Sequence, residues 1–255
     1  MDIEERQQQI ARLVQSKKRV KALALSRMFD VSVETIRKDL LDLQEQGVLV
    51  RVHGGAQIRP VEQESAYERR RAVKAAAKEA IAKQVVDTIQ DGATVYIDYG
   101  TTTYALAAEL LHSRRRARVI TNSMPIANLL GESDLIETIL LGGILRRNER
   151  SLFGPLAEKA LDSIYMDIGF FGCAGVHPVA GVTNHHAFEA ATSFKAMTHC
   201  STVALLADSQ KLETIAVNKL ADLSDIDVLV TDDHPSPELS AALELADVTV
   251  TLVKE

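Results

Sequence analysis

Four polar segments follow apolar, β-branched runs between residues 94 and 211, and their residue types suit an anionic ligand. The first, 98–103, offers a carboxylate, a flexible glycine, hydroxyls and the free N–H groups of a helix start. Gly-Thr-Thr caps helices for structural reasons equally often, and for the glycine pair 142–143 and Arg146, each taken singly, a plain turn with solvated charges is the preferred interpretation. The candidate ligand-binding residues in these segments are Asp98, Gly100, Thr101, Thr102, Thr121, Asn122, Ser123, Gly142, Gly143, Arg146, Asp208, Ser209 and Lys211.

A second set of residues, near the N-terminus, has the types and spacing that contact nucleic acid. Residues 32–47 form an amphipathic pattern, with Ile36, Leu40 and Leu43 on one side of a 3.6-residue period and Lys38 opposite. Ser32 occupies the N-cap position and Gly47 the C-terminal stop. The short apolar pattern at 22–29 precedes it by a tight turn. The pair predicts a helix-turn-helix, whose second helix enters the major groove of DNA.

A strand, a glycine turn and a returning strand over residues 48–56 predict the wing of a winged helix. Arg37 is expected to read a base edge, whereas the wing and the first helix of the pair supply phosphate contacts, which position the protein without specifying sequence. The candidate DNA-binding residues are Lys21, Arg27, Ser32, Glu34, Thr35, Arg37, Lys38, Arg51 and His53.

Charge is unevenly distributed along the 255 residues. The net charge is −6, but residues 1–60 hold 11 Lys and Arg against 8 Asp and Glu. A basic end on an acidic body suits a DNA-reading part, although on charge alone a scattered solvated surface is the preferred interpretation. Cys173 and Cys200 show neither a disulfide framework nor metal-ligand spacing, and the polar N-terminus lacks a signal core. A cytosolic protein with reduced cysteines and no membrane span is expected.

The elements that must position these residues fall into two parts. A helix over 6–16 completes the N-terminal three-helix unit, and the polar stretch 59–68 breaks the pattern. Residues 68–71 begin a helix whose charges are expected to face solvent rather than contact DNA. Later apolar strands alternate with helices, which predicts an α/β fold with an open, mostly parallel sheet covered by helices. We predict a winged helix-turn-helix over 1–58, a linker and connecting helix over 59–75, and a ligand-sensing, oligomerising domain over 76–255.

The order of these motifs resembles one known family. Ser-x-x-Thr-Ile-Arg-Lys-Asp-Leu and Gly-x-Leu-x-Arg-x-His-Gly-Gly-Ala resemble the DNA-binding head of DeoR-family bacterial transcriptional repressors. Further on, Ile-Asp-x-Gly-Thr-Thr, Thr-Asn-Ser, Leu-Gly-Gly, Phe-Gly-Pro, Asp-x-x-Phe-x-Gly-x-x-Gly and Ala-Asp-Ser-x-Lys resemble its effector domain. The resemblance implies a fold similar to ribose-5-phosphate isomerase and control by a phosphorylated sugar or related metabolite.

Two departures from the family pattern bear on the identity of the ligand rather than on the fold. Gln210-Lys211 stands where the family commonly has Ser-Lys, and Glu189 alone stands where it often has an acidic pair. His185 and His186 could tune or bind an unusual effector, but a loop position without special chemistry is the simpler interpretation. No third ligand has metal-site spacing, so neither a metal nor another cofactor is expected.

The leading hypothesis is therefore a non-enzymatic, sequence-specific repressor of carbohydrate-metabolism genes, bound to double-stranded operator DNA and switched by a sugar phosphate. One winged helix contacts little DNA, so a homo-oligomer, a dimer or tetramer, is expected to read spaced half-sites. The alternative is a sugar-phosphate isomerase-like enzyme with a DNA-binding head, in which Asp98, Glu189, Asp208 and Lys211 transfer protons. A protein-interaction adaptor leaves the polar strand ends unexplained.

Overall fold

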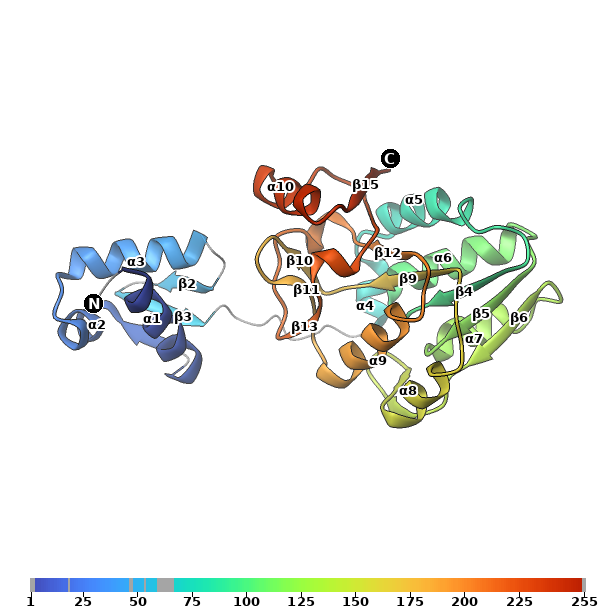
Figure 1. Cartoon of the computed structure of the whole chain (residues 1–255), viewed down its shortest axis with the longest axis horizontal. Helices are drawn as coiled ribbons and strands as arrows, with labels where there is room; N and C mark the ends of the chain where they lie inside the picture. Colours follow the sequence, from blue (N-terminus) through green and yellow to red (C-terminus); the bar gives the residue numbers. More distant parts are fainter. Residues whose placement is uncertain (1–2, 18, 46–47, 53, 59–66, 254–255) are drawn as a thin grey trace. The chain divides into compact units, whose positions relative to one another are not determined.

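The computed structural model describes residues 3–17, 19–45, 48–52, 54–58 and 67–253 (Figure 1). Internal contacts divide the chain into two units, residues 1–62 and residues 63–255, called here the head and the body. Among the described residues, the head has one hydrophobic core and the body has two. The predicted helix stop at Gly47, the wing residue His53 and residues 59–66 of the predicted linker lie outside the described residues.

The head consists of three helices and a small antiparallel sheet of strand order β1-β3-β2. The predicted helix-turn-helix with a wing is confirmed, and the structure adds strand β1, whose three residues were too few to show a strand pattern. Gly55 is required for this added pairing, because a Cβ there would lie 2.0 Å from the Val20 carbonyl oxygen. The elements are α1 (Ile3–Lys17), β1 (Arg19–Lys21), α2 (Ala22–Phe29), α3 (Val33–Glu45), β2 (Leu49–Val52) and β3 (Gly55–Ile58).

A buried ion pair fastens α1 to α3 within the head. Arg6 Nε donates to Asp39 Oδ2 at 2.7 Å and Arg6 Nη2 to Asp39 Oδ1 at 3.0 Å, a bidentate arrangement. Both side chains are less than one-tenth exposed. The pair lies next to the apolar core to which Ile10, Ile36 and Leu40 belong, so water cannot replace either partner.

Asp39→Ala is expected to lower the free energy of unfolding of the head by about 3 to 5 kcal/mol, because it breaks a bidentate ion pair whose two side chains are both buried. Hydrogen exchange of the α1 and α3 amides measures this separately from the body. The control, Glu34→Ala, removes the partner of the exposed Arg37 pair in the same helix and is expected to cost less than about 1 kcal/mol. Equal losses in the two variants would contradict the assignment.

The body is built on a seven-stranded, wholly parallel sheet of order β15-β14-β12-β9-β4-β5-β6. The predicted class, an open parallel sheet covered by helices, is confirmed. These seven strands are apolar runs that alternate with helices along the chain, as the sequence predicted. The strands are β4 (Ala93–Ile97), β5 (Ala117–Thr121), β6 (Ile136–Leu140), β9 (Ile168–Gly172), β12 (Val203–Leu206), β14 (Val228–Thr231) and β15 (Thr249–Leu252).

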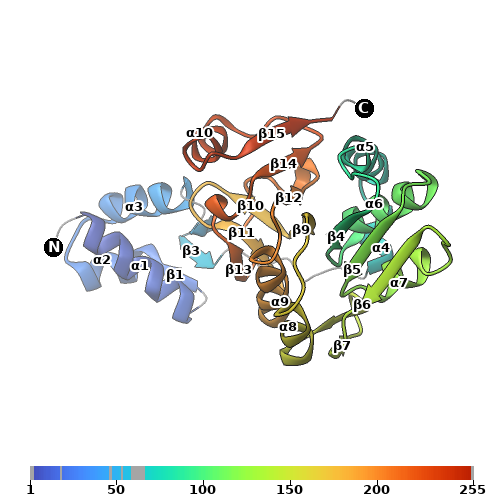
Figure 2. The same cartoon turned by 45° about the vertical axis from the view of Figure 1, so that its right-hand side comes forward.

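Helices cover both faces of this sheet (Figure 2). Side chains alternate along a strand, so Val95 and Ile97 pack in one core with α5, α6 and α7, while Tyr96 packs in the other with α8, α9 and α10. Within the described part of the chain, no helix is both long and apolar enough to span a membrane. The helices are α4 (Tyr67–Ala72), α5 (Ala75–Val86), α6 (Thr101–His112), α7 (Met124–Leu130), α8 (Pro155–Leu161), α9 (Ala187–Met197), α10 (Pro237–Leu245), η1 (Ser209–Lys211) and η2 (Leu223–Asp225).

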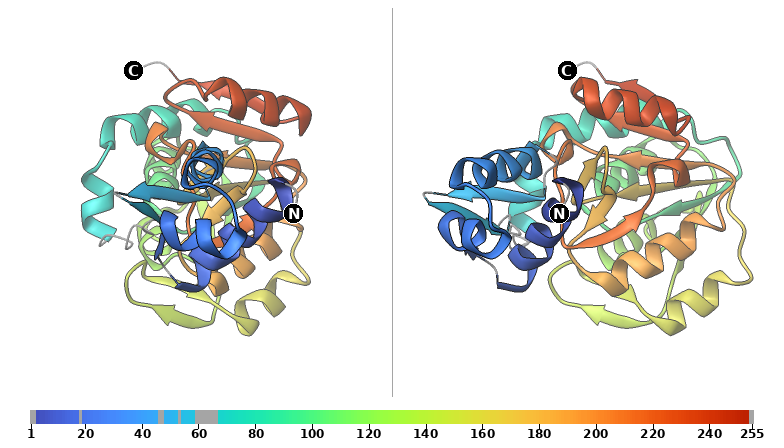
Figure 3. Two further views of the ribbon diagram at one scale, coloured as in Figure 1. Left: turned by 90° about the vertical axis from the view of Figure 1, so that its left-hand side faces the viewer. Right: turned by 60° about the vertical axis from the view of Figure 1, so that its left-hand side comes forward.

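Two smaller strand assemblies in the body were not predicted from the sequence. One is an antiparallel sheet of order β10-β11-β13 and the other is the hairpin β7–β8. Their strands have three or four residues each, too short for a clear alternation. Figure 3 shows the last helix and strand of the chain, in red, at one edge of the body. The missed strands are β7 (Ile144–Arg146), β8 (Ser151–Phe153), β10 (Gly175–His177), β11 (Gly181–Asn184) and β13 (Asn218–Ala221).

The arginine run at the start of the body is only partly solvent-exposed, which corrects the sequence interpretation. Arg69 and Arg71 are exposed, but the Arg70 side chain is only 19% exposed and forms an ion pair with the buried Glu149. The Arg71 guanidinium lies 4.4 Å from the centre of the Tyr104 ring. The run therefore helps to hold α4 against the body.

Candidate nucleic-acid interface and ligand site

The N-terminus of α3 is held by its own hydroxyl groups. The Thr35 N–H donates to Ser32 Oγ at 3.0 Å, which confirms the predicted N-cap, and the two side-chain hydroxyls lie 2.8 Å apart. Ile36 and Leu40 are fully buried in the head core. With one side buried and the start of the helix capped, the outward-facing side chains of α3 have a defined direction.

Three charged side chains occupy the exposed face of α3 at helical spacing. Glu34, Arg37 and Lys38 stand at i, i+3 and i+4, and Arg37 Nη1 donates to Glu34 Oε2 at 3.0 Å. They line a groove of about 680 Å³ together with Arg51 from strand β2. The structure thus places six predicted DNA-binding residues around one groove, namely Ser32, Glu34, Thr35, Arg37, Lys38 and Arg51.

Two further predicted contacts lie elsewhere on the head. Lys21 is exposed at the end of β1 and Arg27 is exposed in the last turn of α2. Neither lines the groove, and their role as phosphate contacts stays a prediction. His53, the predicted wing contact, is outside the described residues.

In the body, the polar segments follow strands on both sides of a change in strand order. From β4 the chain adds β5 and β6 on one side and then β9, β12, β14 and β15 on the other. Ligands of open α/β sheets bind at the carboxyl ends of the strands where this order reverses, here between β4 and β9. Asp98 follows β4, and Asn122 follows the adjacent β5.

Asp98 is fully buried and accepts one bifurcated hydrogen bond from the Ser193 hydroxyl. Ser193 Oγ lies 2.9 Å from each of its carboxyl oxygens. Burial raises the pKa of Asp98 well above the usual carboxyl range, and the negative charge of Glu189 raises it further, against the opposing effect of the Ser193 hydrogen bond. A carboxyl group held neutral in this way can donate as well as accept a hydrogen bond.

Glu189, on the first turn of α9, is the second buried carboxyl group of this region. It accepts hydrogen bonds from Arg146 of β7 and from the Ser151 hydroxyl of β8. His186 caps α9 by accepting from the Glu189 N–H at 3.4 Å. His185 and His186 lie in the loop between β11 and α9, as expected, and the cap gives His186 a structural role at the start of the helix. The hairpin β7–β8 thus brings a cation and a hydroxyl to Glu189.

Asn122 is the unsatisfied member of the Thr-Asn-Ser segment. Thr121 Oγ1 accepts from the Ser123 N–H at 3.1 Å, and Ser123 Oγ caps α7 by accepting from the Ile126 N–H at 3.4 Å. The Asn122 side chain is fully buried, yet its amide nitrogen and oxygen have no hydrogen-bond partner among the described residues. Leaving such groups unpaired costs about 1 to 3 kcal/mol each. Asn122 therefore has a donor and an acceptor available for a ligand.

The glycines of the site have different roles. Gly100 precedes α6 with a φ of +132°, a backbone conformation that favours glycine and opens the helix N-terminus at Thr101 and Thr102. Gly143 is structural, since a Cβ there would lie 2.6 Å from the Phe153 carbonyl oxygen of the hairpin. Gly142 faces open space. The predicted anion contacts at the start of α6 and at Gly142 therefore stay predictions, whereas Gly143 is required by the hairpin.

The fourth polar segment lies two strands from Asp98, beyond β9. The buried Asp208 accepts from the Gln210 N–H at 3.1 Å, and Ser209 Oγ donates to Asp232 at 3.1 Å. Lys78 of α5 is buried here, and desolvation lowers its pKa to about 8 against the charge of Asp208, which raises it. Lys211, on η1, is half-buried and its positive charge lowers the pKa of Lys78. This group of charges is distinct from the contacts around Glu189.

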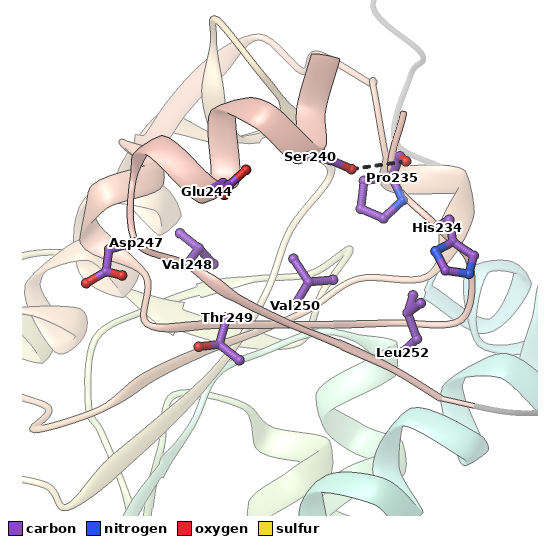
Figure 4. Close-up of a pocket in the computed structure, with 9 residues that line it drawn as sticks. All are labelled: His234, Pro235, Ser240, Glu244, Asp247, Val248, Thr249, Val250 and Leu252. Carbon is purple, nitrogen blue, oxygen red and sulfur yellow. Dashed lines mark hydrogen bonds between the residues drawn. The ribbon is translucent and has the colours of Figure 1, made fainter. Parts of the chain in front are cut away.

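A separate hollow lies at the edge of the body, between α10 and β15 (Figure 4). It has a volume of about 370 Å³, and Val248, Val250 and Leu252 line it together with the charged Glu244 and Asp247. None of the predicted ligand-binding residues lies there, so it is not the predicted site.

Three residues of the body site were not predicted from the sequence. Ser193 stands four residues after Glu189 on the same face of α9, a spacing that could have indicated it. Ser151 and Lys78 carried no such signal, because the hairpin and the packing of α5 against the strand ends bring them to the site.

Comparison with known proteins agrees with both parts of the architecture. The model of the DeoR-like helix-turn-helix domain family matches residues 6–60. The model of the DeoR C terminal sensor domain family matches residues 73–233. The putative aga operon transcriptional repressor of Escherichia coli O157:H7 is 33% identical over 98% of this chain and 94% of its own length. The glycerol-3-phosphate regulon repressor of Escherichia coli K12 is 30% identical over 89% of each chain.

Ribose 5-phosphate isomerase A from Methanocaldococcus jannaschii has 18% identity, with 53% of each chain covered and a TM-score of 0.40. The fold, the head and the two family matches together define a DNA-binding transcriptional regulator with a sensor domain. The chain belongs to the DeoR family.

Arg37→Ala is expected to cost about 1 to 3 kcal/mol of DNA affinity and to relax sequence discrimination at one base position, if the guanidinium reads a base edge. Selection of bound sites from a random duplex pool measures the discrimination. As a control, Arg27→Ala removes a predicted phosphate contact and is expected to weaken binding to all sequences about equally. Unchanged discrimination in Arg37→Ala contradicts its assigned role.

Asp98→Asn is expected to gain stability relative to the wild type as the pH rises. Because the pKa of Asp98 is raised in the folded state, folding takes up a proton. The free energy of unfolding of the wild type therefore falls as the pH rises from the usual carboxyl pKa range to the raised pKa. The asparagine variant does not titrate, so urea unfolding at several pH values should show the difference growing with pH.

The control for this effect is Asp91→Asn, which should show the opposite trend. Hydrogen bonds from Arg116 lower the pKa of the exposed Asp91, so its contribution is present at neutral pH and is lost as the pH falls through the lowered value. A pH-independent difference for Asp98→Asn would show that burial does not hold this carboxyl group in its neutral form.

Proposed function

We propose that this regulator is a repressor of carbohydrate-metabolism genes whose affinity for operator DNA changes when a phosphorylated sugar or a related metabolite binds the body. The observation that carries the proposal is the fully buried Asn122 amide at a strand end, beside Asp98, without a partner among the described residues. The printed names of the relatives, which include an aga operon repressor and a glycerol-3-phosphate regulon repressor, support the same class of target genes.

The body offers complementary groups for the two ends of such a ligand. The N–H groups at the start of α6, together with the Thr101 and Thr102 hydroxyls, suit a phosphate. Asn122 and a neutral Asp98 can each donate and accept hydrogen bonds, as the hydroxyl groups of a sugar require. Of the remaining predicted ligand-binding residues, Gly142, Arg146 and Glu189 are proposed for the same site, and Asp208, Ser209 and Lys211, which form a separate group of charges, are proposed as a second set of contacts.

DNA recognition follows from the groove on the head. Arg37 and Glu34 of α3 face the base edges, and Arg51 of the wing contacts the backbone. One head covers one half-site, so a homo-oligomer formed through the body supplies the second. We propose the winged helix as residues 1–58, the connecting segment as 59–75 and the sensing and oligomerising domain as 76–255, acting on DNA in the cytoplasm.

The test is reciprocal linkage in the full-length chain. Sugar phosphates are screened by thermal shift, and any compound that stabilises the body is tested for its effect on binding to DNA upstream of the protein's own gene. A true effector shifts DNA affinity, and the DNA shifts effector affinity by the same factor, because both report one coupling free energy. Failure of the head to bind any duplex at low salt excludes the proposal.

An isomerase-like enzyme is the second candidate, and the buried carboxyl groups of Asp98 and Glu189 are what favour it. Both side chains are engaged, the first by Ser193 and the second by Arg146 and Ser151. Such pairing suits recognition better than proton transfer. Turnover of aldose and ketose phosphates by the full chain distinguishes the two, and its absence alongside effector-dependent DNA binding supports the regulator.

A further inference from the structure

Helix α4 is the first element of the body, and residues 59–66 alone separate it in sequence from strand β3 of the head. Tyr67 at its start is only 4% exposed, so the helix is packed on the body rather than suspended in solvent. Any displacement of α4 therefore moves the point at which the chain leading to the head is attached.

Two ion pairs join α4 to the turn of the β7–β8 hairpin. The Arg70 guanidinium contacts the carboxylate of Glu149, which is almost fully buried. Arg150 Nη2 lies 3.5 Å from Glu68 Oε1 in an exposed pair. The buried pair is expected to dominate, because the Glu149 side chain is only 2% exposed, whereas both partners of the Arg150–Glu68 pair are more than half exposed.

The same hairpin holds the buried carboxylate of the proposed effector site. Arg146 and Ser151 are paired across its two strands, and both side chains contact Glu189. The Arg150 N–H donates to the Arg146 carbonyl at 2.8 Å and closes the turn. A short hairpin thus has one charged contact to the site, through Glu189, and another to α4, through Glu149.

The end of α4 has a second connection to the strand-end loops. Lys78 Nζ donates to the carbonyl oxygens of Arg70 at 2.5 Å and Val73 at 2.7 Å, so it satisfies groups that the helix end leaves open. Lys74 lies between α4 and α5 and has a φ of +54°. Its Nζ lies 3.4 Å from Asp232 Oδ2. The helix is therefore fixed at its C-terminal end and joined to the hairpin along its length.

We propose that Arg70 and Glu149 are positioning residues that transmit occupancy of the effector site to α4, with the β7–β8 hairpin as the moving part. A bound anion competes with Glu189 for Arg146, the hairpin changes position to keep its buried charges paired, and Glu149 carries Arg70 with it. The inference rests on the proposed function and specifies how the site and the head communicate.

Hydrogen exchange of the full-length chain tests the link from both ends without a known effector. Arg70→Ala is expected to accelerate exchange of the hairpin amides, residues 144–153, by about tenfold or more. Glu189→Gln, at the other end of the hairpin, is expected to accelerate exchange in α4. In the charge-swapped double variant, Arg70→Glu with Glu149→Arg, exchange of the hairpin should return toward the wild-type rate.

The matched control is Arg118→Ala, which removes one partner of the exposed pair with Glu137 on β5 and β6. It should leave both segments unchanged. Exchange of the β9 and β12 amides shows that each variant is folded, and Arg70→Lys, which keeps the charge, provides a milder perturbation. If folded Arg70 variants leave the hairpin unchanged, or Glu189→Gln leaves α4 unchanged, the link does not exist.

Binding of the same proteins to duplex DNA at low salt distinguishes this inference from the proposed function. Duplex binding without coupled exchange overturns the link alone. Coupled exchange in a chain that binds no duplex overturns the proposed function and leaves the hairpin contact as a structural feature of the body.

Discussion

The body depends on three buried carboxyl groups, those of Asp98, Glu149 and Glu189. Each is at most 2% exposed, so protein groups must replace the water that a carboxyl group otherwise binds. Asp98 accepts a hydrogen bond from Ser193, Glu189 accepts hydrogen bonds from Arg146 and Ser151, and Glu149 pairs with Arg70. These partners come from α9, the β7–β8 hairpin and α4, so the requirement to satisfy buried carboxyl groups brings three otherwise separate elements together.

The head obeys the same rule on a smaller scale. Arg6 and Asp39 pair inside its core, and this contact fixes α1 across α3 while the other side of α3 stays exposed. The exposed face carries Glu34 and Arg37, whose pair is accessible to solvent and therefore weak. The buried pair fixes the helices, and the exposed charges stay accessible to a partner. A surface that binds DNA requires both properties.

Most strands and helices could be predicted from the sequence, because the apolar patterns that mark them extend over only a few neighbouring residues. The runs at β4, β5 and β9 are apolar on both faces of the sheet, and each strand end is marked by a glycine or a polar residue. The hairpin β7–β8 escaped because three-residue strands show no period. Arg70 was expected to face solvent because the interpretation of a charge run considers only its neighbours in sequence, whereas Glu149 is 79 residues away.

The sequence by itself determined the helix-turn-helix with its capped second helix, the α/β class of the body and the polar strand ends where a ligand would bind, because each follows from residue types at short spacing. Only the tertiary structure decided which of those polar residues are satisfied by other parts of the chain. Ser123 and Thr121 hydrogen-bond locally, Glu189 is neutralised by a distant hairpin, and Asn122 keeps its amide unpaired among the described residues. That outcome depends on burial and on long-range contacts, which residue spacing does not contain.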